Sequence, residues 1–135
     1  MTSTSHRVLL VGLAMLLVAI PALAHHSVEA EFTFHETVVT GVLTKIEWIN
    51  PHTYFYMDVK DAQGNVTQWT GESYPTGFFH RAGLTRDLFK VGDTLTMILF
   101  LAKDTTQPRF GWMHKVILPG GRTLTFDNNC EKDSQ

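Results

Sequence analysis

Cysteine is almost absent from this chain, which limits how the fold can be stabilised. The 135 residues include one cysteine, Cys130, so no internal disulfide can form. Cys130 falls in a polar C-terminal tail, residues 127–135. There it is interpreted as a tolerated surface thiol or, because exported proteins meet an oxidising environment, as the site of an intermolecular disulfide. The domain must therefore rely on its own hydrophobic core, for which residues 25–126 are long enough.

Long apolar runs and a strong charge of one sign are also missing. The run from Val8 to Ile20 falls short of the ~20 residues needed to cross a bilayer. The formal net charge of −2 opposes non-specific nucleic-acid binding, because such binding depends on neutralising phosphates. We therefore expect no nucleic-acid partner and no stable membrane anchor in the mature protein.

The N-terminal apolar run instead has the parts of a secretory signal. Arg7 supplies the positive charge, the run to Ile20 supplies the apolar segment, and Ala22-Leu23-Ala24 supplies a small-residue cleavage site. These features predict a signal peptide over residues 1–24, cleavage between Ala24 and His25, and a periplasmic or secreted product.

Period-two alternation predicts that residues 25–126 form one mainly β domain. Residues 25–37 form a polar segment before the first strand. Phe32 and Phe34 are expected to anchor this segment to the body of the domain. Gly41 suggests a bend or bulge in the first strand, and Asn50-Pro51 ends that strand. The expected strands cover residues 38–49, 53–60, 66–71, 94–101, 110–118 and 123–126.

A short helical stretch is expected between the third and fourth strands. Tyr74-Pro75 begins it, Gly83 ends it, and Thr85 begins one further turn. Three strands, a helical connection and two or three further strands predict a small five- to six-stranded barrel like the oligonucleotide/oligosaccharide-binding (OB) fold. A small β-sandwich is the alternative.

Several short motifs connect the chain to a known group of proteins. They are Ala24-His25-His26-Ser27, Trp48-Ile49-Asn50-Pro51-His52, Trp69-Thr70-Gly71-Glu72, Gly92-Asp93 and Gly120-Gly121-Arg122. In the order and spacing of these motifs, the chain resembles a family of small exported bacterial proteins of unknown function. It departs from the family at Asp104-Thr105, where an Asp-Gly pair is usual, and in the tail with Cys130. The resemblance implies an exported single β domain and no assigned activity.

Metal binding by the new N-terminus is the strongest candidate chemistry. Cleavage before His25 frees an α-amine beside an imidazole, and His26 adds a second imidazole. Neutral amine and imidazole nitrogens suit copper and zinc. His52 is the predicted third ligand, because Pro51 fixes the turn that carries it. Weaker candidates are His35, His114 and, for cuprous copper, Met97 and Met113.

A purely structural role for these histidines is the alternative interpretation. In that case His25 and His26 are a solvated start whose residues merely suit the signal peptidase. His52 and Asn50 then hydrogen-bond to backbone groups at a turn.

The sequence leaves two further functions open. Trp48, Tyr54, Tyr56 and Trp112 can form an aromatic face that recognises a glycan, peptide or protein partner, although they also suit packing within the sheet. Hydrolysis has little support, because Ser27 and Ser73 lie in no nucleophile elbow. Glu47 and Glu72, carboxylates at strand ends, are a weak signal by themselves. The balance is against an enzyme, with ligand, oligomeric state and process open.

Overall fold

Six β-strands and three short helices make up the described part of the chain. The structure is a computed structural model and describes residues 28–126. The chain divides into two compact units, Met1–Ala30 and Glu31–Gln135, and the sheet lies in the second. The elements are α2 (Val28–Glu31), β1 (Phe32–Glu47), β2 (Thr53–Lys60), β3 (Val66–Ser73), α3 (Thr76–Arg81), the 3₁₀ turn η2 (Arg86–Leu88), β4 (Thr94–Ala102), β5 (Phe110–Ile117) and β6 (Thr123–Thr125).

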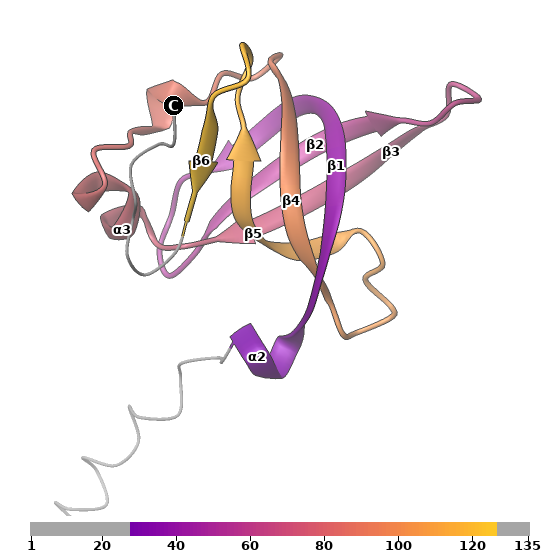
Figure 1. The fold of residues 1–135 in the computed structure, drawn as a ribbon, viewed down its shortest axis with the longest axis horizontal. Coiled ribbons are helices and arrows are strands. Elements are labelled where there is room, and N and C mark those ends of the chain that lie inside the picture. The colour runs from indigo at the N-terminus through magenta and orange to yellow at the C-terminus, as the bar shows by residue number, and fades with distance from the viewer. Residues whose placement is uncertain (1–27, 127–135) are drawn as a thin grey trace, which may run out of the picture. The chain divides into compact units, whose positions relative to one another are not determined.

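Strand β1 is long and serves two neighbours. Its first part pairs with β4, from Phe32 to Val42, and its second part pairs with β2, from Val42 to Glu47. Figure 1 shows the strand curving as it passes from one partner to the other. A register shift between Leu43 and Lys45 interrupts the ladder to β2. The bulge expected from the glycine therefore lies beyond Gly41, which is instead a close backbone approach to β2.

Strands β2 and β3 form a hairpin with alternating faces. Phe55 and Met57 are fully buried, whereas Tyr54 and Tyr56 lie on the opposite, outer face. The connecting loop is held by Asp61, whose carboxylate accepts hydrogen bonds from the backbone N–H groups of Gln63 and Asn65. This hairpin carries the outer-face side chains that matter for the candidate site.

The sheet closes on itself. Its order is β3-β2-β1-β4-β5-β6, and a parallel pairing of β3 with β5 joins the two sides. The described strands thus form a single closed sheet, not the two facing sheets of a sandwich, and the predicted mainly β fold class with a helix after the third strand is confirmed. The closure brings residues about forty positions apart in the sequence, such as Glu72 and Trp112, into register.

Helix α3 and turn η2 contribute to the core inside this sheet. Pro75 precedes α3 with its φ fixed at −64°, which suits a helix start, and Gly83 follows with a φ of +71°, which favours glycine. Phe79 of α3 is fully buried, and Phe89 after η2 is nearly so. Both rings pack on Trp48 and Phe55.

The structure corrects two details of the sequence prediction. Strand β1 begins at Phe32, six residues before the expected start, because Glu36, Thr37 and their neighbours pair with β4. Of the two expected anchors, Phe32 is buried at 2% exposure, whereas Phe34 is 59% exposed and anchors nothing in the core.

Candidate functional site

The turn that carries His52 is fixed by hydrogen bonds to the first residue of α3 and to the segment before it. The side-chain oxygen of Asn50 accepts hydrogen bonds from the backbone N–H and the hydroxyl of Thr76. Next to His52, the Thr53 hydroxyl donates to the carbonyl oxygen of Tyr74 at 3.0 Å. The prediction that Asn50 binds backbone at this turn is confirmed, and the turn gives His52 a defined position at the start of β2.

His52 is paired with a buried carboxylate. Its Nδ1 contacts Oε1 of Glu72 near the end of β3. The Glu72 side chain is only 10% exposed, and the His52 side chain is 28% exposed. Burial of a carboxylate is costly unless a partner satisfies it, so the contact stabilises Glu72 and at the same time fixes the orientation of the imidazole.

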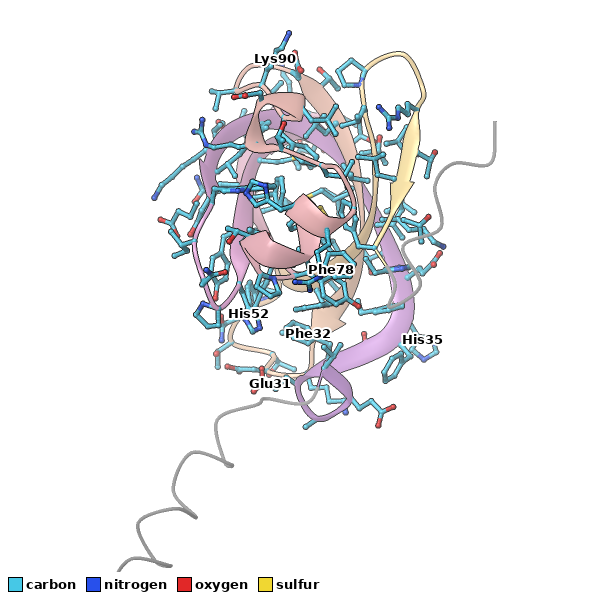
Figure 2. All side chains as sticks on the ribbon, turned by 90° about the vertical axis from the view of Figure 1, so that its left-hand side faces the viewer. Glu31, Phe32, His35, His52, Phe78 and Lys90 are labelled. Atoms are coloured by element: carbon cyan, nitrogen blue, oxygen red, sulfur yellow. The ribbon has the colours of Figure 1, made fainter. Side chains whose placement is uncertain are left out.

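Aromatic rings surround this pair. The His52 ring meets the nearly buried Trp112 indole edge-on, with centroids 5.7 Å apart. Tyr74 and Phe32 also contact Trp112, at centroid distances of 5.0 and 6.0 Å. We call Phe32, His52, Tyr74 and Trp112 the Trp112 cluster. Figure 2 shows Phe32 and His52 in the same region of the molecule, together with Phe78, which stacks on Tyr74.

A row of polar side chains continues from Glu72 across the outer face of the sheet. Tyr54 on β2 lies in register with Glu72 on one side and with Glu47 of β1 on the other. Glu47 and Glu72 are thus on strands separated by β2, with Tyr54 between them. The two carboxylates therefore do not face each other across neighbouring strands.

The charges of this row are paired within the sheet. Lys45 donates a hydrogen bond to Glu47, and the Tyr56 hydroxyl donates another at 3.1 Å. Both hydrogen bonds hold the pKa of Glu47 below its usual value, and the bond from Lys45 has the larger effect. Burial, followed by the charge of Glu72, raises the pKa of Tyr54, which therefore stays a neutral phenol at physiological pH.

The remaining metal candidates lie apart from His52 or outside the described residues. His25 and His26 fall outside residues 28–126. His35 is exposed on β1, His114 stacks on Phe100, and Met97 and Met113 are fully buried in the core. Within the described range, no three side chains of His, Cys, Asp or Glu form a group that would hold a metal by itself.

The four aromatic residues predicted to form a binding face have different environments. Trp48 packs on Phe79 and Phe89, and Trp112 is the centre of the Trp112 cluster. Tyr54 and Tyr56 are half-buried on the outer face of β2.

The sequence did not identify Glu72 as the partner of His52. In the sequence, the only indication of this contact is that Glu72 alternates onto the outer face of its strand.

Comparison with known proteins gives a family and distant structural likenesses. None of the helices in residues 28–126 has the length and hydrophobicity of a membrane crossing. No curated protein matches the chain. Among solved structures, the ZRD-deleted mutant of TiaS in complex with agmatine is similar at 17% identity and a TM-score of 0.44. The match covers 76% of this chain and 25% of that one, so this chain spans a quarter of its length.

A family model accounts for most of the sequence. The model matches residues 14–112 and so includes the turn with His52, all of β1 to β4, and Trp112. The chain belongs to DUF6152, a family of unknown function.

Proposed function

We propose that the protein is exported and binds copper or zinc through its mature N-terminus. After cleavage between Ala24 and His25, the α-amine and imidazole of His25 and the imidazole of His26 are the first ligands, and His52 completes the site. These are nitrogen ligands of the kind that copper and zinc prefer, with copper favoured by the general affinity order. The α-amine has an ordinary pKa of about 7.7–8.0, so a metal can displace its proton near neutral pH.

The observation that carries the proposal is the convergence of two chain segments on Trp112. Phe32, at the start of β1, and His52, at the start of β2, both contact the indole. His26 precedes Phe32 by six residues, a length that spans at most about 20 Å. This short sequence separation supports the proposal that His25 and His26 bind the same metal as His52.

Two preparations of the protein test the proposal. One has the native start at His25, and the other carries one extra residue before it, which removes the α-amine from the chelate. Titration with Zn²⁺, which does not displace the protons of backbone amides, is expected to give clearly weaker binding for the extended form. Equal affinities would contradict the proposal, as would mass spectrometry of the exported protein showing a different first residue.

A second candidate function is recognition of a glycan, peptide or protein partner by aromatic side chains. It is favoured by Tyr54 and Tyr56, which lie on the same outer face of β2 and remain partly exposed. Their hydroxyls and ring faces suit a ligand that is apolar on one side and polar on the other. Arrays of glycans and peptides are the test, and binding that the Tyr56→Ala variant does not weaken would argue against this face.

A further inference from the structure

The pairing of His52 with Glu72 has a consequence for how a metal would be bound. Glu72 is held between Tyr54 on β2 and Trp112 on β5 by the registers of both neighbouring strands. Its side chain is only 10% exposed, and Nδ1 of His52 is the nitrogen that its carboxylate contacts. A neutral imidazole carries one proton, and a carboxylate at Nδ1 favours the form with the proton on Nδ1. Nε2 is then the nitrogen with a free lone pair.

We propose that Glu72 is a positioning residue that makes Nε2 of His52 the ligating nitrogen. The inference rests on the proposed metal-binding function and deepens it. A carboxylate behind a metal-ligating histidine fixes the tautomer and the ring orientation, and loss of such a partner costs about 10–100-fold in metal affinity. The edge-on contact with Trp112 restricts rotation of the same ring from a second side.

The burial of the two side chains assigns their roles. The imidazole is nearly three times as exposed as the carboxylate, at 28% against 10%. The imidazole is therefore the partner that an arriving ligand or chain segment can reach, and the carboxylate lies behind it. This arrangement favours a positioning role for Glu72 over direct coordination.

A set of variants tests the role of Glu72 in the protein with its native His25 start. Glu72→Gln keeps the size of the side chain and removes its charge, and it is expected to weaken Cu²⁺ binding about 10–100-fold. Glu47→Gln is the matched control, because Glu47 lies on the same face and pairs with Lys45 and Tyr56 instead of a histidine. Its Cu²⁺ affinity is expected to equal that of the wild type. In a double-mutant cycle, Glu72→Gln is expected to cost nothing further once His52 is alanine.

A spectroscopic measurement on the wild type gives a readout that does not depend on the fold of any variant. Long-range ¹H–¹⁵N correlation spectra of the protein loaded with Zn²⁺ or Cu⁺ identify the metal-bound nitrogen of each histidine. The expected result for His52 is a metal on Nε2 and a proton on Nδ1. Coordination through Nδ1, or direct coordination by Glu72, would overturn the inference.

The failure of this inference and that of the proposed function have different signatures. If His52→Ala weakens Cu²⁺ binding and Glu72→Gln does not, the positioning role of Glu72 is wrong and the metal site stands. If neither His52→Ala nor the extra N-terminal residue changes the affinity, the proposed function itself is wrong.

Discussion

The imidazole of His114 stacks on the ring of Phe100, with centroids 4.1 Å apart and planes inclined by 5°. Its Nε2 is buried and has no hydrogen-bond partner among residues 28–126, although it lies 3.2 Å from Oε1 of Glu36. Burial, and then the charge of Lys115, lowers the pKa of His114, and the charge of Glu36 offsets part of this effect. The folded protein therefore disfavours the charged imidazole.

Stability is expected to fall as the pH drops below about 6.5, the ordinary pKa of histidine. Because the pKa of His114 is lowered on folding, the unfolded chain binds its proton first, and unfolding takes up a proton in this range. The contribution of His114 to stability is complete above the pKa that it has in the unfolded chain. It is lost as the pH falls through the lower pKa that it has in the folded protein. Thermal melts of metal-free protein between about pH 5 and 7.5 measure this decline.

The His114→Phe variant is the control for this pH dependence. It keeps a ring against Phe100 and removes the titrating group, so its melting temperature is expected to vary less with pH. Equal slopes for the variant and the wild type would show that another group is responsible.

Helix α3 is expected to stabilise the fold mainly through the buried ring of Phe79. Phe79 is fully buried and contacts Trp48 and Phe126, each at a centroid distance of 5.0 Å. Phe79→Ala removes this packing and is expected to cost about 3–5 kcal/mol in the free energy of unfolding. The matched control is Phe34→Ala, which changes a ring that is 59% exposed and is expected to cost less than about 1 kcal/mol. Denaturant unfolding measures both values, and similar losses would contradict the assigned core.

A glycine comparison tests the close approach of β1 and β2. A Cβ added at Gly41 would lie 2.5 Å from the backbone carbonyl oxygen of Asp58, so the strands would have to separate. Gly41→Ala is expected to cost about 1–3 kcal/mol, the usual range for overpacking. Gly77→Ala is expected to be neutral or stabilising by up to about 1 kcal/mol, because Gly77 lies in α3 with space for a methyl group. A stable Gly41→Ala protein would show that the ladder yields easily here.

Tryptophan fluorescence provides a test of where copper binds. The Trp112 indole centroid lies 5.7 Å from that of the His52 ring, and Cu²⁺ quenches indole emission at short range. Addition of Cu²⁺ to the mature protein is expected to quench part of its emission, and Trp112→Phe is expected to remove most of that effect. Trp69→Phe changes an indole on β3 outside the Trp112 cluster, and it should leave the quenching by Cu²⁺ unchanged. Undiminished quenching in Trp112→Phe would place the copper away from His52.

Local patterns predicted the elements whose residues alternate clearly. Strand β2 was predicted with its observed bounds because Phe55 and Met57 alternate with Tyr54 and Tyr56. The start of β1 was missed because residues 33–37 are mostly polar and exposed, and their strand conformation depends on pairing with β4. Phe34 contacts Phe100 of β4 but stays 59% exposed, so it packs on the surface and not in the core. An aromatic residue in the sequence does not by itself show which face of a strand it occupies.

The candidate site, like the fold, was predicted only in part from the sequence. The turn at Asn50-Pro51 was predicted from the sequence, and the hydrogen bonds of Asn50 with Thr76 explain why that turn is fixed. The role of His52 as a metal ligand stays a prediction. Its partner Glu72 was not predicted, because no local pattern links a turn before one strand to the end of the next.

The sequence alone determined the mainly β character, the turns and the short helix, because alternation and turn residues act over a few neighbouring positions. The tertiary structure decided which outer-face side chains meet. The parallel pairing of β3 with β5 closes the sheet and aligns Glu72 with Trp112, and the pairing of β2 with β3 brings Tyr54 to the same carboxylate. Such contacts depend on the registers of several strands at once, because a shift of one residue would turn every side chain to the opposite face.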